Sequence, residues 1–290
     1  LVGIGFLLVV LNIFKKNKIC EGFEQEEKFI LKKNDELYDD FYVNIYDALI
    51  YEPYKKDFEV DKIIKTTKMN PKSMVLDVGS GIGHHLAALI DKNIPAVGLE
   101  TSKAMIKKCR STYSKNVNVK YANAMDSMLF ETDQFTHIMC LFYTFYYLPG
   151  QEAFLRNCNK WLRHNGYLII HIVDRNNFHP IIPPSEIFSV PAQKFAKKDE
   201  RITKSLVKFK GYKYEAEFKD DFKKDKGYFN EIFTDDNTGH IRKNIHTLLM
   251  KNRNDYEKMF KDFGFKTKTV VNLSEVGYHH QFLYFLQKEH

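Results

Sequence analysis

The residues that most clearly imply chemistry are a glycine-rich run at 75–83, which reads VLDVGSGIG. Its glycines, Gly79, Gly81 and Gly83, lack Cβ atoms, so the backbone can adopt positive φ and approach a ligand closely. An apolar run precedes the glycines and a helical pattern follows them, so the unpaired amides of a helix N-terminus would face a bound group. The run therefore predicts a ligand site where a buried strand meets a helix.

Glu100 directly follows the next apolar run, residues 96–99, at the end of the strand predicted there. In this position its carboxylate can accept hydrogen bonds from a ribose diol. We expect it to face a cleft and to contribute little to fold stability. A nicotinamide dinucleotide site shares this arrangement, but its glycines follow G-x-G-x-x-G to admit a pyrophosphate. Here the third glycine comes one residue sooner, and Asp77 stands two residues before the first glycine. This spacing argues against a dinucleotide site.

The elements that must position these residues alternate between short apolar runs and helical patterns. The runs lie at 74–78, 96–99, 117–121, 137–142 and 167–173, and the helices between them at 84–92, 102–111 and 151–164. Such alternation predicts a parallel sheet that is covered on both faces.

Beyond Asp174 the pattern changes. Residues 176–250 combine a proline-containing loop with alternating strands, which predicts a substrate-side loop and an antiparallel β insertion that acts as a mobile cover. A helix at 254–263 and strands at 266–272 and 281–287 close the chain. The predicted fold class is α/β, a Rossmann-like doubly wound sheet of seven strands, mostly parallel with the last strand antiparallel.

Residues 1–14 are almost wholly apolar, and three of the next four residues are lysines. Fourteen helical residues rise about 21 Å, less than the roughly 30 Å hydrocarbon core of a bilayer. We interpret residues 1–18 as a truncated membrane anchor, with a buried apolar helix as the alternative, and the charged residues 19–40 as a linker. The lysines predict membrane association with the globular part of the chain on the cytoplasmic side.

The composition fits one core domain with additions, since 44% of the 290 residues are hydrophobic. A net charge of +7 permits an anionic partner without requiring one, because Lys and Arg are interleaved with acidic residues. The four cysteines form no CxxC pair, which argues against a disulfide framework and against a zinc site. We expect no metal.

As a set, these motifs resemble those of class I S-adenosylmethionine-dependent methyltransferases. VLDVGSGIG looks like the first motif of that family, GLETSKAMIKKC the second, YANAMDSMLF the third, and FTHIMCLFYTFYYL the fourth strand and its following loop. The resemblance covers about residues 40–174. It implies a methyltransferase domain over residues 41–290, with S-adenosyl-L-methionine as the cofactor.

The same resemblance assigns Glu100 to the ribose and Met105 to the adenine face. The third motif has Asn123 before Ala124, where the family usually has an acidic residue; an amide oxygen can still accept a hydrogen bond. The other residues that the resemblance places around the cofactor are Asp77, Gly79, Ser80, Gly81, Gly83, Thr101, Cys140 and Leu141.

A sulfonium methyl is already activated, so the protein needs chiefly to hold a desolvated nucleophile in line behind it. The aromatic run after the fourth strand suits this task, because rings attract a sulfonium and a tyrosine hydroxyl orients an acceptor. We assign this role to Tyr143 and Tyr146 and expect the other rings to be core. His171, near the end of the fifth strand, is the candidate general base, with Asp174 and His179 as alternatives.

Three functions stay open at this point. The first is methyl transfer to a small-molecule or protein acceptor. The second is RNA methylation, which a modest basic excess at 194–226 permits, although no RNA-binding module is visible and nucleic acid is not the partner that we favour. The third is a membrane-tethered, non-catalytic protein that uses the fold for interaction. The intact glycines, Asp77 and Glu100 argue against the third.

Overall fold

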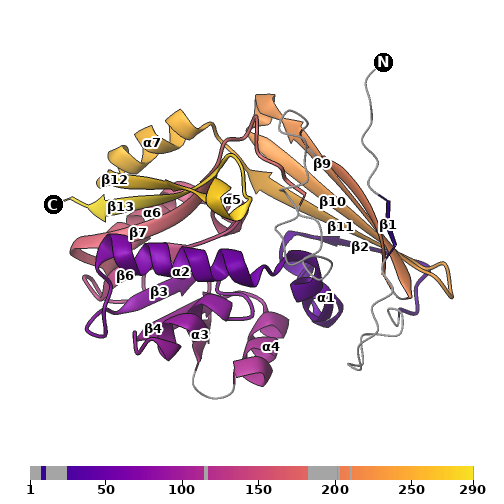
Figure 1. The fold of residues 1–290 in the computed structure, drawn as a ribbon, viewed down its shortest axis with the longest axis horizontal. Helices are drawn as coiled ribbons and strands as arrows, with labels where there is room; N and C mark the ends of the chain where they lie inside the picture. The colour runs from indigo at the N-terminus through magenta and orange to yellow at the C-terminus, as the bar shows by residue number, and fades with distance from the viewer. Residues whose placement is uncertain are drawn as a thin grey trace.

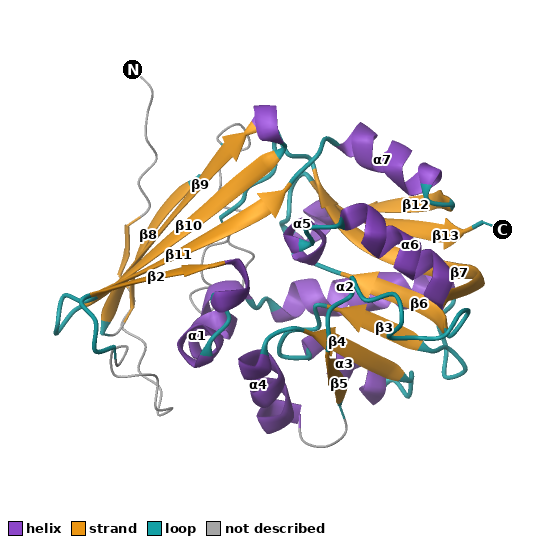
Figure 2. Ribbon diagram, turned by 180° about the vertical axis from the view of Figure 1, so that it is seen from behind, coloured by secondary structure: helices purple, strands orange, loops and turns teal. Residues whose placement is uncertain are grey.

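Two β-sheets lie side by side in the computed structural model, and helices surround the first of them (Figure 1). The structure describes residues 8–10, 25–113, 117–181, 201, 203–209 and 211–289. The first sheet has seven strands and the second has six. A view from behind shows the same division, with the helices gathered around the seven-stranded sheet (Figure 2).

The seven-stranded sheet confirms the predicted α/β class. Its strands, in spatial order, are β12 (Phe265–Asn272), β13 (Gln281–Lys288), β7 (Leu162–Val173), β6 (Phe135–Cys140), β3 (Val75–Val78), β4 (Ala96–Glu100) and β5 (Asn118–Tyr121). From β7 to β5 all neighbours are parallel, whereas β13 runs antiparallel to both β7 and β12. The last strand is therefore the antiparallel one, as predicted.

Helices cover both faces of this sheet, because each has one apolar stripe that must be buried. One face carries α5 (Thr144–Tyr147), α6 (Gln151–Trp161) and α7 (Arg253–Asp262). The other carries α2 (Pro53–Thr67), α3 (His84–Asp91) and α4 (Lys103–Tyr113). The carboxyl ends of β3, β4 and β6 are left open between these layers, and this is where ligand sites form in such sheets.

The second sheet confirms the predicted antiparallel strands and extends beyond them. In spatial order it comprises β1 (Leu8–Val10), β8 (Lys204–Phe209), β9 (Tyr212–Asp221), β10 (Lys226–Asp235), β11 (Ile241–Leu249) and β2 (Phe29–Lys33). The neighbours from β8 to β11 are antiparallel, whereas β1 and β2 pair in parallel with β8 and β11.

The assignment of residues 19–40 to a linker is wrong at β2. This strand pairs with β11 through its backbone, while its apolar side chains Phe29 and Leu31 stay exposed. An edge strand held by main-chain hydrogen bonds leaves no burial pattern in the sequence, which is why composition did not predict it.

Of the predicted anchor at residues 1–18, only Leu8–Val10 lies within the described residues, so the anchor itself falls outside them and stays a prediction. Within the described ranges, no helix has both the length and the apolar character needed to span a bilayer.

The segment 176–250 is more than a cover over the first sheet. Phe178, Phe218, Leu248 and Met250 are all buried in the same core as the strands and helices of the seven-stranded sheet. Helix α1 (Asp40–Ile50) packs on the same face of the second sheet, the one that carries Phe218. The two sheets therefore share buried side chains, so the described part of this segment is not separate from the first sheet, and its mobility stays a prediction.

Arg175, just after β7, joins the two sheets and is only 2% exposed. It donates hydrogen bonds to the carbonyl oxygens of Met250 (2.6 Å) and Lys226 (3.0 Å) and to the carboxylate of Asp225 (3.1 Å). Its guanidinium also lies 4.6 Å from the Phe222 ring centroid. A buried cation with these partners fixes the turn between β9 and β10 against the end of β7.

We expect Arg175→Ala to lower the free energy of unfolding by about 3–5 kcal/mol, because it strips buried acceptors of their charged donor. Urea denaturation followed by circular dichroism measures this change. The exposed Arg110→Ala is the matched control and should lie within about 0.5 kcal/mol of the wild type. Equal stabilities of the two variants would contradict the proposed junction.

Candidate active site

A cavity of about 330 Å³ lies at the open ends of β3, β4 and β6 and reaches the inner face of the second sheet. This volume falls within the range of roughly 300–1,000 Å³ typical of small-molecule sites. Helix α1 closes it, because Val43 packs on Ile82 and Met105 while Tyr42 packs on the second sheet. Most of the residues predicted to surround the cofactor line it: Asp77, Gly79, Ser80, Gly81, Glu100, Thr101, Met105, Asn123, Ala124 and Leu141.

The glycine turn between β3 and α3 needs its glycines for two different reasons. Gly79 has φ +69°, and a Cβ there would lie 2.5 Å from the Thr144 side chain. Gly81 has φ +54°, and nothing lies within 4 Å of a Cβ built on it. The first glycine therefore permits the close approach of α5, and the second leaves open space on the cavity side.

Gly83 does not line the cavity, which corrects its assignment as a contact residue. It caps the start of α3 with φ +88°, and a Cβ there would lie 2.6 Å from the sulfur of Cys109. Its role is to let α3 and α4 pack closely.

The Glu100 carboxylate forms the polar floor at this end. Its Oε2 accepts a hydrogen bond from the Gly81 amide at 2.9 Å, and its Oε1 accepts from the amides of Thr101 and Ser102 at 2.8 Å each. Burial raises the pKa of Glu100, and the three amides oppose that rise. A carboxylate has about four lone-pair sites, so one site remains for a ligand hydroxyl.

Asp77 lies beneath the turn and is 3% exposed. Burial raises its pKa to about 7, the nearby carboxylates of Glu100 and Glu59 add to the rise, and His85 opposes it. None of the described residues donates a hydrogen bond to it. A carboxyl group in this state gains most from a positively charged group placed in the cavity beside it.

The apolar end of the cavity is formed by Met105 and Ala124, which are 2% and 4% exposed. Beside them, the Asn123 oxygen already accepts a hydrogen bond from the Met125 amide at 3.0 Å. Asn123 therefore shapes this turn with its side chain, and its amide group is the donor left for a ligand.

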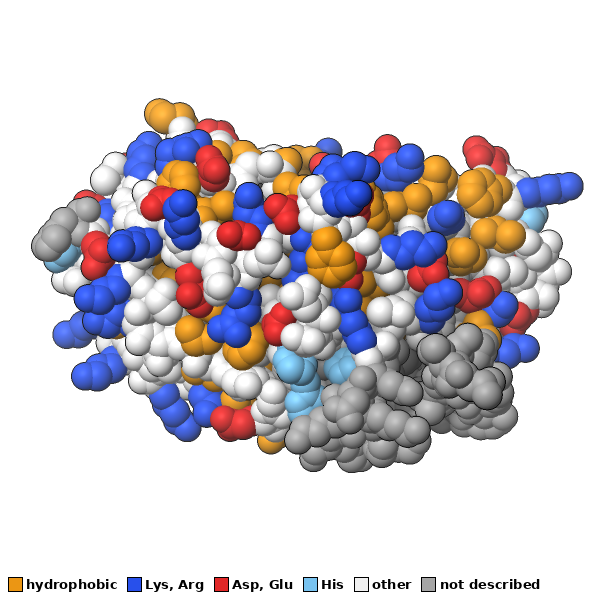
Figure 3. Space-filling view, turned by 90° about the horizontal axis from the view of Figure 1, so that it is seen from above, with side chains coloured by type: hydrophobic (Ala, Val, Ile, Leu, Met, Phe, Trp, Pro, Cys, Tyr) orange, Lys and Arg blue, Asp and Glu red, His pale blue; other side chains and the backbone are white. Residues whose placement is uncertain are grey.

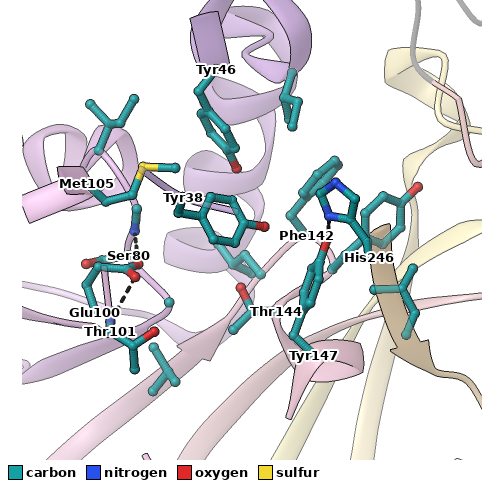
Figure 4. A pocket seen from close by; sticks show the side chains of 18 of the residues that line it. Tyr38, Tyr46, Ser80, Glu100, Thr101, Met105, Phe142, Thr144, Tyr147 and His246 are labelled. Atoms are coloured by element: carbon teal, nitrogen blue, oxygen red, sulfur yellow. Dashed lines mark hydrogen bonds between the residues drawn. The ribbon is translucent and has the colours of Figure 1, made fainter. Parts of the chain in front are cut away.

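At the far end, aromatic rings and a buried acid replace the glycine turn. The ring of Tyr38 lies 5.7 Å from Tyr42, 6.2 Å from Tyr46 and 6.3 Å from Tyr147, measured between centroids. Figure 4 shows Tyr38 between the group around Glu100 and the pair formed by Tyr147 and His246.

Glu231 and His246 extend from β10 and β11 into this end. The Nε2 of His246 lies 2.7 Å from the Glu231 Oε2, and its Nδ1 lies 2.6 Å from the Tyr147 hydroxyl. Side chains far apart in the sequence thus form one chain of contacts. Tyr147 is among the rings expected from the sequence to be core, and neither Glu231 nor His246 was predicted as a site residue.

A signal for these residues does exist in the sequence. Glu231 stands in phase with Phe229 and Phe233 in a strand of period two, and His246 stands in phase with Leu248. An acid and an imidazole on an apolar strand face predict buried partners for one another.

Of the three predicted catalytic residues, only Tyr143 lines the cavity. Tyr146 is 1% exposed, and its hydroxyl accepts a hydrogen bond from the Val173 amide at 2.8 Å, so it is a core residue. The short helix α5 turns Tyr143 and Tyr147 toward the cavity and Tyr146 toward the core. The assignment of Tyr146 is therefore wrong.

His171 and Cys140 are likewise buried away from the cavity. His171 has no exposed surface, its Nδ1 lies 2.7 Å from the Phe142 carbonyl oxygen, and burial lowers its pKa to about 4. Cys140 lies in the core of the first sheet. Each faces inward because alternate residues of a strand point to opposite faces, and the sequence does not show which face meets the cavity.

The Lys55–Glu59–His85 cluster carries the charge on the α2 side of the cavity. Lys55 lies 2.5 Å from the Glu59 carboxylate, and the His85 Nε2 lies 3.1 Å from its other oxygen. Despite complete burial, these partners lower the pKa of Glu59 to about 2. Among the described residues, Lys55 and Lys56 are the only lysines or arginines that line the cavity.

Residues 75–166 match the model of a family described as a methyltransferase domain. No curated protein matches the chain. Among solved structures, the CcbJ methyltransferase from Streptomyces caelestis is 15% identical, over 88% of this chain and 99% of that one, with a TM-score of 0.67.

Two further structures share the fold. The sugar N-methyltransferase KedS8 from Streptoalloteichus sp. ATCC 53650 is 19% identical, over 82% and 88% of the two chains, with a TM-score of 0.58. CalS10 from Micromonospora echinaspora, an amino pentose methyltransferase, is 18% identical, over 83% and 98%, with a TM-score of 0.54.

The family match begins at the first residue of β3, so it contains the glycine turn, Glu100 and the apolar pair of Met105 and Ala124. These are the residues that the structure gathers at one end of a single cavity. Residues 75–166 therefore carry a methyltransferase domain of the class I S-adenosylmethionine-dependent type.

Proposed function

We propose that the chain methylates a small organic molecule that binds between the glycine turn and the second sheet. The observation that carries this proposal is the continuity of the cavity, which runs from Glu100 to Tyr147 and His246 under the cover of α1. A closed end walled by aromatic rings suits a compact acceptor. KedS8 and CalS10, which share the fold, are described as acting on a sugar and an amino pentose.

The distribution of charge supports a small molecule over RNA. A nucleic-acid site needs basic side chains that follow a phosphate backbone. Of the described lysines and arginines, only Lys55 and Lys56 line the cavity. On the face drawn in Figure 3, Lys and Arg side chains are interspersed with Asp and Glu.

The described residues fit the methyl donor. Glu100 is placed for one ribose hydroxyl, Met105 and Ala124 for the adenine, and the unpartnered Asp77 carboxyl for the amino group of the methionine part. When bound, S-adenosyl-L-methionine supplies an electrophilic methyl on a sulfonium. The contribution of the protein is to orient the acceptor toward that methyl and to exclude water from it.

We expect Glu100→Gln to weaken S-adenosylhomocysteine binding roughly thirty- to a hundredfold, because a charged acceptor is worth about 2–3 kcal/mol here. The same change should also destabilise the fold by about 1–3 kcal/mol, since it disturbs three backbone amides that the carboxylate holds. Calorimetric titration and urea denaturation measure the two effects. The exposed Glu131→Gln should change neither; a Glu100 variant with full affinity would remove this residue from the site.

Asp77 makes stability depend on pH. The unfolded chain releases this proton near pH 3.8 and the folded chain near pH 7, so the folded state binds the extra proton between these values. Its stability then falls as the pH rises through this window.

The Asp77→Asn variant has no such carboxyl group, so its stability should not fall in this pH window. Its free energy of unfolding relative to that of the wild type should therefore increase by about 2–3 kcal/mol between pH 5 and pH 8. Urea denaturation of the ligand-free protein at both pH values measures it. The exposed Asp262→Asn serves as control and should track the wild type. Parallel curves for Asp77→Asn and wild type would contradict a raised pKa at Asp77.

A further inference from the structure

Glu231, 1% exposed, forms hydrogen bonds with four side chains at the far end of the cavity. Its Oε1 accepts from the hydroxyls of Tyr42 at 3.0 Å and Tyr214 at 2.8 Å; its Oε2 accepts from Asn244 at 3.1 Å and lies 2.7 Å from the Nε2 of His246. His246, Asn244 and Tyr214 hold the pKa of Glu231 below its usual value against burial, so its side chain is an ionised carboxylate. Because its lone pairs are filled, Glu231 acts on a ligand through its neighbours.

This arrangement dictates the tautomer of His246. An ionised Glu231 only accepts, so the Nε2 of His246 must carry the proton. The Nδ1 of a neutral imidazole is then an acceptor, and the Tyr147 hydroxyl, 2.6 Å away, donates to it (Figure 4). The oxygen of Tyr147 has two lone pairs, of which the Tyr38 hydroxyl engages one, and Tyr147 lines the cavity. Tyr147 therefore presents a hydrogen-bond acceptor to whatever lies there.

The charge around this acceptor favours a cation. Glu231 supplies a full negative charge, and the rings of Tyr38, Tyr42 and Tyr46 stand around it. The two lysines that line the cavity lie on α2, and one of them is paired with Glu59. Aromatic faces and a buried carboxylate attract an ammonium group and disfavour a carboxylate or phosphate.

We propose that the acceptor is an amine that enters as its ammonium ion, and that Tyr147, His246 and Glu231 form the relay that takes its proton. The inference rests on the proposed function, since it assigns the second ligand of the same cavity. An ammonium ion is repelled by the neighbouring sulfonium. Its nitrogen also has no lone pair with which to attack the methyl group. The relay removes both obstacles before methyl transfer.

The ammonium N–H proton passes to the Tyr147 oxygen while the Tyr147 hydroxyl proton passes to the Nδ1 of His246. His246 becomes an imidazolium paired with Glu231, and the acceptor nitrogen gains a lone pair. That lone pair forms the N–CH3 bond, the S–CH3 bond breaks, and its electron pair stays on sulfur. The imidazolium then returns its proton to solvent when the products leave.

The groups that face the relay support this direction of transfer. Burial alone would raise the pKa of Glu231, but His246, Asn244 and Tyr214 outweigh burial and hold the pKa below its usual value. Burial raises the pKa of Tyr147, so Tyr147 is a neutral hydroxyl that passes protons on. The other titratable groups facing them are Tyr38, Tyr42, Tyr46, Tyr143 and Tyr214, whose pKa values burial also raises.

The test uses the full chain with ¹⁵N-labelled histidine and bound S-adenosylhomocysteine, and reads His246 by long-range ¹H–¹⁵N NMR, assigned with His246→Gln. At neutral pH the expected spectrum shows a protonated Nε2 and a bare Nδ1. Benzylammonium should shift the Nδ1 signal; Tyr147→Phe should abolish that shift, and the exposed Tyr121→Phe should keep it. An imidazole protonated on both nitrogens from pH 6 to 9, or only on Nδ1, would overturn the relay.

Affinity for matched probes tests the amine assignment. Benzylammonium should bind at least about tenfold more tightly than benzoate, because one is attracted and the other repelled by the charge of Glu231. Glu231→Gln should reduce that preference to about twofold or less. Equal affinities in the wild type, or no response to benzylammonium, would refute an amine acceptor.

The two proposals fail in different ways. Calorimetry that detects no S-adenosylhomocysteine binding by the wild type would remove the proposed function and this inference together. Normal S-adenosylhomocysteine binding with a cationic His246 would remove only the relay.

Discussion

The carboxylate of Glu100 ties together the parts of the site that the first sheet supplies. Through the amides of Gly81, Thr101 and Ser102 it connects the turn after β3 to the beginning of α4. Both the open space at Gly81 and the position of Met105 depend on that connection. The residue best placed to hold a ribose is thus also structural, which corrects the expectation that a strand-end carboxylate contributes little to stability.

The second sheet completes the cavity from the opposite side. Its strands bring Glu231 and His246 to Tyr147, which follows β6 of the first sheet. The position of these strands depends in turn on the shared core and on Arg175. We infer that the first sheet holds the methyl donor, whereas the second sheet selects the acceptor and takes its proton.

The sequence predicted well the part of the site that the first sheet supplies, because the residues that form it lie close together in the chain. The spacing of Asp77, the glycines and Glu100 is set by one turn and two adjacent strands, so short-range pattern suffices. The apolar runs of β3, β4, β6 and β7 are likewise direct signs of a buried parallel sheet.

The rest of the site depends on contacts between distant segments. Tyr147 and His246 are separated by 99 positions, and no local pattern shows that they meet. Within the aromatic run, the choice between Tyr146 and Tyr147 depends on how the four-residue helix α5 is rotated, which tertiary packing decides. β2 was missed for a related reason, since its pairing with β11 uses only the backbone.

The most direct test of the central claim is an experimental structure of the full chain with S-adenosylhomocysteine. We expect a ribose hydroxyl on the Glu100 carboxylate, the adenine against Met105 and Ala124, and the sulfur turned toward the Tyr147 end of the cavity. A nucleoside bound elsewhere, or a complex in which Glu100 contacts only the three backbone amides, would contradict it.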